Sequence, residues 1–113
     1  MTTPLTRKRC VPCEAGTPPM PPDEAKRLAE QVPGWELKPD EQKLVRRFKL
    51  KDFREAMAFL NRVADLAESE GHHPDIHISW NRVRLELTTH AIKGLSENDF
   101  IMAAKISDLD HRF

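Results

Sequence analysis

Hydrophobic residues recur at helical spacing in the first two-thirds of the chain. One such stretch begins at Pro22, which suits a first helical turn, and ends at Pro33-Gly34. A longer stretch begins at Asp52, forms a pattern like a capping box with Glu55, and ends at Gly71. Its apolar stripe, which we expect to bury most of the core, comprises Phe53, Ala56, Met57, Leu60, Val63, Ala64 and Ala67. The pattern predicts two helices.

Between these two helices the pattern changes to alternation, which is typical of strands. Trp35 and Leu37 alternate with polar residues in a short strand, and Pro39-Asp40 turns the chain. The apolar face of a second strand comprises Leu44, Phe48 and Leu50. Arg46 is an exception on that face.

The stretch after Gly71 predicts a β-hairpin with Asn81-Arg82 as a two-residue loop. The predicted pairs are Trp80 with Val83, Ile78 with Leu85, and Ile76 with Leu87. Every apolar residue then meets another on one face, as a half-buried antiparallel pair requires. The same register places His90 opposite His73, so two sequence-distant histidines come to one end of the hairpin.

A last helix is expected after Ser96, with Asp99 at its third position. Its core-facing residues are Phe100, Ala103, Ala104 and Ser107. The predicted order is helix, two strands, helix, two strands, helix. This order indicates an α+β fold: a four-stranded, mostly antiparallel sheet with helices on one face, in two layers.

The first part of the chain has a different composition from the rest. Residues 1–22 hold six of the nine prolines, so neither a helix nor a sheet can run through them. We therefore divide the chain into a proline-rich arm, residues 1–21, and one domain, residues 22–113. The arm contains Cys10 and Cys13, but a structural zinc would need His72 or His73 as further ligands, and no strand-to-helix context supports redox chemistry. We expect no metal.

Size and charge exclude several classes of protein. A chain of 113 residues suits one hydrophobic core. Lys and Arg number 18 and Asp and Glu number 18, so no global field attracts nucleic acid or an anionic membrane, and neither is an expected partner. No apolar run approaches the roughly 18 residues of a membrane span, and the start lacks the apolar stretch of a signal peptide. We expect a cytoplasmic protein.

Histidine is the compositional exception, because four of the five histidines fall between residues 72 and 90. The spaced set comprises Glu68, His72-His73-Pro74, Trp80, His90 and Asp99. This set resembles the signature of the pterin-4a-carbinolamine dehydratase family, in residue types and in spacing. The resemblance also covers the order of elements from about residue 22 to the end.

The resemblance implies loss of water from a 4a-hydroxytetrahydropterin to give the quinonoid dihydropterin, without a cofactor, in tetrahydrobiopterin regeneration. Imidazole suits the chemistry, because with a reference pKa of about 6.5 it can serve as acid or base near neutral pH. The resemblance makes His72, His73, His90 and Asp99 the catalytic residues. We expect His72 and His90 to be the acid/base pair and His73 mainly to hold the pterin.

The resemblance also implies supporting residues and partners. Glu68 and Asp99 would orient the histidines or favour their charged form. The pterin would be lined by His72, His73, Pro74, Thr89, His90, Ala91 and Ile92. We expect a homodimer or homotetramer with a sheet that continues across subunits. An aromatic amino acid hydroxylase is the expected partner in the pathway.

Simpler interpretations remain open for several of these residues. Asp99 can be only the capping partner of Ser96, Glu68 a solvated residue, and His-His-Pro an exposed turn. Trp80 is expected in the core rather than at a ligand, and His77 on the surface opposite Glu86. The whole chain can also be a non-catalytic binding module, a coactivator or assembly chaperone. Deleting residues 1–20 should leave fold and activity mostly intact; loss of activity alone would show that the arm helps to build the site.

Overall fold

The computed structural model describes residues 5–11, 18–38, 40 and 42–110. The helices are α1 (Pro22–Ala29), α2 (Phe53–Glu70) and α3 (Glu97–Asp110), and the strands are β1 (Glu36–Lys38), β2 (Lys43–Lys49), β3 (Asp75–Ser79) and β4 (Arg82–Leu87). Two short 3₁₀ helices, η1 (Leu5–Arg7) and η3 (His90–Ile92), accompany them. The predicted order of helices and strands is confirmed.

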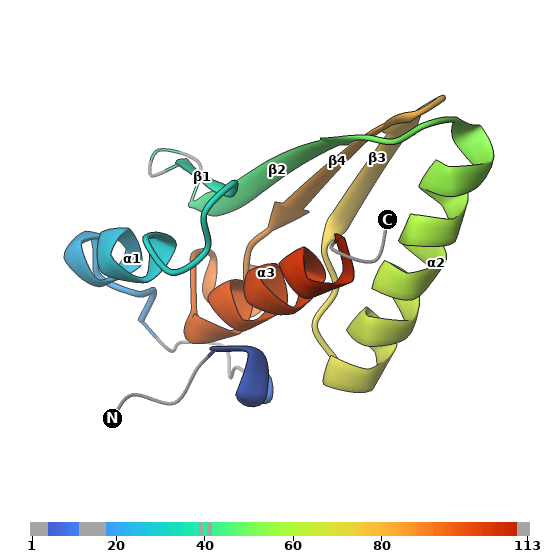
Figure 1. Cartoon of the computed structure of the whole chain (residues 1–113). Coiled ribbons are helices and arrows are strands. Elements are labelled where there is room, and N and C mark those ends of the chain that lie inside the picture. The colour runs from blue at the N-terminus through green and yellow to red at the C-terminus, as the bar shows by residue number, and fades with distance from the viewer. Residues whose placement is uncertain (1–4, 12–17, 39, 41, 111–113) are drawn as a thin grey trace.

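The four strands form one antiparallel sheet in the order β1-β2-β4-β3, with the helices on one side of it (Figure 1). The predicted two-layer α+β fold is therefore confirmed. β1 and β3 are the edges of this sheet. The three-residue β1 offers little unpaired backbone, whereas the five-residue β3 offers a longer free edge.

The hairpin forms, but its predicted register is wrong. Ile78 pairs with Val83, and the loop is Trp80-Asn81 rather than Asn81-Arg82. The cause is a tertiary contact: the side-chain amide of buried Asn81 donates to the backbone oxygen of Leu50 at 2.9 Å, and Leu50 N–H donates to Asn81 O at 2.9 Å. These two bonds hold Asn81 in the turn. Each β3 residue therefore pairs with the β4 residue two positions earlier than predicted.

The altered register changes the position of two residues. Trp80 takes a φ of 52° in the turn and is 66% exposed, so the expectation that it lies in the core is wrong. His77 is exposed, as expected, but lies opposite Arg84 rather than Glu86. Both registers pair apolar residues on one face, so the hydrophobic pattern alone could not distinguish them.

Helix α2 begins and ends as predicted, but its buried face is rotated. The Asp52 carboxylate accepts from Glu55 N–H at 2.9 Å, and Gly71 ends the helix with a φ of 68°. The buried stripe is Ala56, Phe59, Leu60, Val63 and Ala67. Phe53, Met57 and Ala64, all predicted to be core, are exposed, Phe53 by 49% and Met57 by 38%. The helix therefore leaves part of its apolar surface uncovered.

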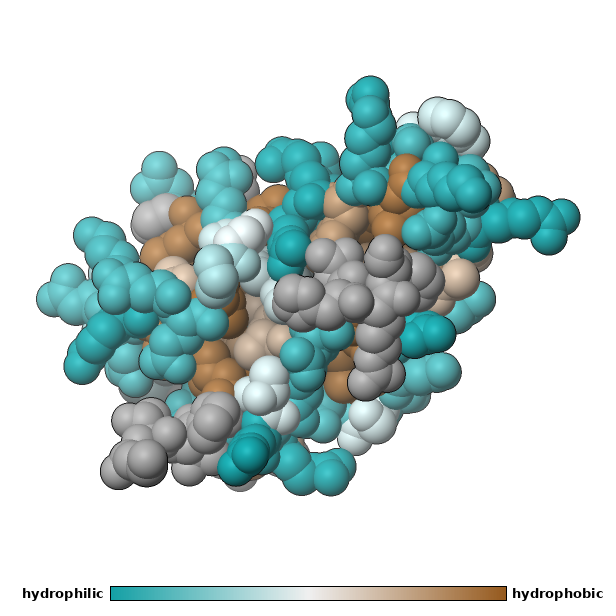
Figure 2. Space-filling view, viewed as in Figure 1, coloured by the Kyte–Doolittle hydropathy of each residue, from teal (hydrophilic) through white to brown (hydrophobic). Residues whose placement is uncertain are grey.

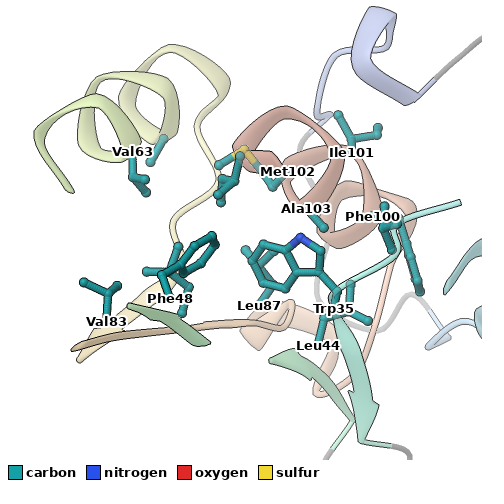
Figure 3. Close-up of a cluster of buried hydrophobic side chains, with 14 of the residues drawn as sticks. Trp35, Leu44, Phe48, Val63, Val83, Leu87, Phe100, Ile101, Met102 and Ala103 are labelled. Atoms are coloured by element: carbon teal, nitrogen blue, oxygen red, sulfur yellow. The ribbon is translucent and has the colours of Figure 1, made fainter. Parts of the chain in front are cut away.

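The core lies between the sheet and the helices (Figure 3). Phe48 stacks obliquely on Phe59 at 4.8 Å between ring centroids and contacts Trp35 edge-on at 6.4 Å. Arg46, the exception on the apolar face, lies 4.7 Å from the centre of the Phe48 ring and donates to Ser107 Oγ at 2.8 Å. Trp35 Nε1 donates to the same hydroxyl at 3.0 Å. These contacts fix α3 on the sheet.

The described parts of the arm pack on the domain. Leu5 is buried in the core, and Met20 packs against it. Met20 N–H donates to Leu95 O at 2.8 Å. The arm therefore contributes to the core, although the division of the chain between residues 21 and 22 stays a prediction.

Polar and charged side chains cover much of the face in Figure 2, with apolar patches between them. Among the described helices, none has the length and apolar character to cross a membrane.

Candidate active site

Four segments meet at a hollow of about 300 Å³ near the end of α2. They are the turn after α2, the end of β4 with η3, the start of α3, and the arm. The lining residues are Val11, Gly71, His72, His73, Thr88, Thr89, His90, Ala91 and Asn98. The volume is at the lower end of the range for small-molecule sites. All three histidines of the sequence signature therefore lie in one hollow, although not through the predicted register.

His72 is the most constrained of these histidines. Its side chain is 12% exposed, and Gly71 in the left-handed conformation turns it away from the helix axis. Its Nε2 lies 2.7 Å from Oδ1 of Asp99, whose side chain is completely buried. A carboxylate can only accept, so Nε2 carries the proton and donates it. Nδ1 is thereby left as the ring nitrogen available to a ligand.

Asp99 is held by other donors besides His72. Its Oδ2 accepts from Thr89 Oγ1 at 2.9 Å and from Ser96 N–H at 3.0 Å. Because the Thr89 hydroxyl proton is used there, Ser96 Oγ donates to Thr89 Oγ1, at 2.7 Å. The carboxylate therefore caps α3 and also orients His72. The simpler interpretation of Asp99 as a cap alone is wrong.

His73 and His90 are far more exposed than His72. The His73 side chain is 57% exposed and its Nε2 lies 3.3 Å from Oε1 of Glu68, which is itself 79% exposed. The His90 side chain is 75% exposed and its Nε2 lies 3.9 Å from Oδ2 of Asp75, which is too far for a hydrogen bond. Both rings are free to reach a ligand in the hollow.

The remaining predicted lining residues divide into two groups. Thr89 and Ala91 line the hollow, whereas Pro74 and Ile92 are buried outside its lining. Ile92 instead anchors the turn that carries His90. Sequence reasoning missed Val11, Gly71, Thr88 and Asn98 as lining residues. Asn98 adjoins Asp99 on α3 and could have been suspected, but nothing in the sequence pattern connects Val11 to the histidines.

A second polar cluster lies beside the hollow, where the arm meets α2 and α3. The Glu70 carboxylate accepts from Cys10 N–H at 2.9 Å and from Lys105 Nζ at 2.9 Å. Burial raises the pKa of Glu70, but these two donors outweigh burial and leave the pKa below its usual value. Burial, with the neighbouring Glu70 charge, raises the pKa of Cys10 to about 12. The Cys10 thiol therefore stays protonated near neutral pH.

The cysteine pair of the arm raised the question of a metal site. Among the described side chains, no three His, Cys, Asp or Glu residues are grouped so as to hold a metal ion. Cys13 lies outside the described residues, so the cysteine pair stays untested. A larger hollow of about 510 Å³ lies across β2, β4 and β3. Four of its nine lining residues are Arg or Lys, and it contains none of the signature residues.

Comparison with known proteins identifies the family. The sequence model of the family described as pterin 4 alpha carbinolamine dehydratase matches residues 18–109, so the chain belongs to this family. A Methylococcus capsulatus protein whose name assigns it to this family is 52% identical over 105 residues, which are 93% of this chain and 92% of that protein.

Three further proteins show the range of names among relatives. The Arabidopsis thaliana pterin-4-alpha-carbinolamine dehydratase 2, mitochondrial, is 50% identical; the match covers 93% of this chain and 58% of that protein. A crystal structure titled transcriptional coactivator/pterin dehydratase, from Brucella melitensis, superposes with a TM-score of 0.76 at 32% identity, over 80% of this chain and 97% of that one. A structure titled pterin dehydratase-like protein, a RuBisCO assembly factor in the alpha-carboxysome, has a TM-score of 0.59 at 27% identity, over 67% of this chain and 88% of that one.

Proposed function

We propose that the protein is a 4a-hydroxytetrahydropterin dehydratase that uses histidine acid/base catalysis. The observation that carries this proposal is the buried His72–Asp99 pair at 2.7 Å, in a hollow that also contains His73 and His90. Dehydration breaks the bond between C4a and its hydroxyl, releases water, and removes a proton from N5. The reaction needs one proton donor and one proton acceptor and no electron transfer.

His72 suits the role of proton acceptor. Its Nε2–H is bonded to Asp99, so Nδ1 is the ring nitrogen that carries the lone pair. The buried Asp99 carboxylate would stabilise the imidazolium that forms when His72 takes the proton from N5. Thr89 and Ser96 keep that carboxylate in place, so the ring needs no reorientation during the reaction.

His90 suits the role of proton donor to the leaving hydroxyl. Its ring is 75% exposed, so it can regain a proton from water after each turnover. His73 is the candidate for holding the pterin, with Glu68 as its orienting partner at 3.3 Å. Pro74 and Ile92 would act by shaping the backbone around the hollow, and Thr89 and Ala91 by lining it.

The test is loss of the carbinolamine absorbance in the presence of pure protein. The His72→Ala/His90→Ala double variant should fall close to the uncatalysed rate, because each acid or base is typically worth about 10²- to 10⁴-fold. His77→Ala is the matched control, since this exposed histidine lies on β3 outside the hollow. Near-wild-type turnover by the folded double variant would refute the catalytic assignment.

A non-catalytic binding role is the alternative function. Two structural neighbours have titles that mention coactivator and assembly-factor roles. All three histidines of the signature line one hollow, which favours the enzyme. The same assay decides, because wild-type protein with no effect on the carbinolamine would favour a binding module.

We further propose that the protein is a homo-oligomer, a dimer or a tetramer, in which subunits pair through the free edge of β3. Five exposed apolar residues gather on this strand, its turn and α2: Phe53, Met57, Ile76, Ile78 and Trp80. A free strand edge beside uncovered apolar side chains is typical of a surface that pairs with another copy. Light scattering should give at least twice the 13.0 kDa chain mass, and a single 13.0 kDa species at micromolar concentration would contradict the proposal.

Two parts of the proposal concern the cell rather than the molecule. We place the reaction in tetrahydrobiopterin regeneration in the cytoplasm, with an aromatic amino acid hydroxylase supplying the carbinolamine. Coupled turnover with such a hydroxylase would test the pathway, and fractionation of the source cells would test the compartment.

A further inference from the structure

The arm reaches the histidine hollow through a contact that the proposed reaction does not explain. Val11 lines the hollow beside His72, His73 and His90, although 61 residues separate it from His72 in the sequence. Val11 is 64% exposed, which is unusual for valine and places an exposed apolar residue beside three histidines.

A dedicated residue holds Val11 in this position. Asn98 Oδ1 accepts from Val11 N–H at 3.0 Å, and Asn98 Nδ2 donates to Val11 O at 2.6 Å. The Asn98 side chain thus binds both backbone groups of one arm residue, as a neighbouring strand would. Asn98 is 5% exposed and directly precedes Asp99, so it is rigidly connected to the residue that orients His72.

Contacts on both sides of Val11 fix the arm further. On the amino-terminal side, Cys10 N–H donates to Glu70, and Lys8 Nζ lies 3.0 Å from Glu97 Oε2. After the undescribed residues 12–17, Pro19 packs on Gly94 so closely that an added Cβ there would lie 2.6 Å from Pro19 Cβ. The arm therefore contacts both ends of the segment 94–98, which joins the His90 turn to α3.

We propose that the arm forms one wall of the pterin site, with Val11 as a substrate-contacting specificity residue and Asn98 as the positioning residue that holds it. The proposal rests on the proposed dehydratase function for the identity of the substrate. The pyrimidine part of the pterin is nearly planar and presents a broad face, and an exposed isopropyl group beside three polar rings is suited to cover it. Covering the ring also removes the exposed Val11 surface from water, which favours binding.

Substitutions in the arm should change KM, whereas substitutions of the catalytic histidines should change kcat. A wall that contacts the substrate equally before and during reaction changes KM and leaves kcat nearly constant. Val11→Ala should raise KM about threefold to tenfold, the scale expected for partial loss of two methyl contacts. Asn98→Ala should raise KM about tenfold, because the wall must then be ordered when substrate binds.

The experiment measures KM and kcat for the carbinolamine, and, separately, calorimetric binding of a 7,8-dihydropterin, which lacks the 4a-hydroxyl and cannot react. Arg7→Ala is the matched control, since Arg7 is an exposed residue of the same arm and does not line the hollow. We expect weaker dihydropterin binding in both test variants and wild-type values in Arg7→Ala.

Each outcome bears on one proposal. Unchanged KM and dihydropterin affinity in folded Val11→Ala would overturn the arm proposal, as would a fall in kcat at constant KM. Val11 is exposed, so this variant should fold even if Asn98→Ala does not. Wild-type protein that binds dihydropterin but does not dehydrate the carbinolamine would refute the dehydratase function, and the affinities would still test the wall.

Discussion

His72 and His90 line the same hollow in opposite environments. His72 is 12% exposed and bonded at 2.7 Å to a carboxylate that is itself fully buried. His90 is 75% exposed, and its Nε2 lies 3.9 Å from the Asp75 carboxylate. One ring is fixed in tautomer and orientation, and the other is in contact with water. The difference indicates a division of labour between a preorganised group and one that exchanges protons with solvent.

The largest expected effect comes from replacing Asp99, the buried partner of His72. Asp99→Ala leaves the donors of His72, Thr89 and Ser96 without an acceptor. A stranded buried donor costs about 1–3 kcal/mol, so we expect the free energy of unfolding to fall by about 4 kcal/mol in urea denaturation. Asp108→Ala, an exposed position on the same helix, should change it by less than about 0.5 kcal/mol. A loss below about 1 kcal/mol for Asp99→Ala would show that the network is not structural.

The two histidines should differ in stability as well as in chemistry. His72→Ala removes one partner from the buried Asp99 carboxylate and should lower the free energy of unfolding by about 1–3 kcal/mol. His90→Ala should stay within about 0.5 kcal/mol of wild type, because the ring is mostly in water. Paired urea denaturation curves measure both values. Equal losses of unfolding free energy in the two variants would contradict the difference in environment between His72 and His90.

Acid should act on the buried side of the site through Glu70. Its pKa is below the usual value in the folded protein, so it stabilises the fold above the ordinary glutamate pKa of about 4.3. This stabilisation is lost as the pH falls through the lower folded-state pKa, since protonated Glu70 no longer pairs with Lys105. Stability curves against pH should show this loss in wild type and not in Glu70→Gln. The same pH dependence of stability in wild type and Glu70→Gln would contradict the role assigned to Glu70.

The smallest effect is expected at the exposed edge of the site. Glu68 and His73 are 79% and 57% exposed, and exposed ion pairs are worth about 0–1 kcal/mol. Glu68→Ala should therefore leave the unfolding free energy within about 0.5 kcal/mol of wild type and raise KM only slightly. A double-mutant cycle with His73→Ala checks this, and a coupling well above 1 kcal/mol would assign Glu68 a larger role.

The order of helices and strands was predictable because each element carries its own local signal. Asp52 and Gly71 bound α2 through capping chemistry, and alternation identifies the strands. The register of the hairpin was not predictable, because two registers satisfy the same hydrophobic pattern. Asn81 decides between them through its bonds to Leu50, 31 residues away in the sequence.

The candidate site was predictable in its histidines and in Asp99, whose spacing the family signature defines. Val11 was not predictable, because a proline-rich arm has no periodicity from which a docking position can be read. The position of Val11 depends on its hydrogen bonds to Asn98. An asparagine amide can bond to many partners, and only the packed fold determines which partner it binds. The same limit explains the rotated α2 stripe: Phe53 and Phe59 are equally apolar, and the sheet selects Phe59.

The two tryptophans differ in exposure, so their fluorescence reports separately on the core and on the surface. Trp35 is 6% exposed and bonded to Ser107, whereas Trp80 stands in the hairpin turn at 66% exposed. Trp80 should therefore emit at longer wavelength and be readily quenched by iodide, while Trp35 should be shielded. Anything that covers the turn after β3, a second copy of the chain included, should shift this emission to the blue and protect it from the quencher.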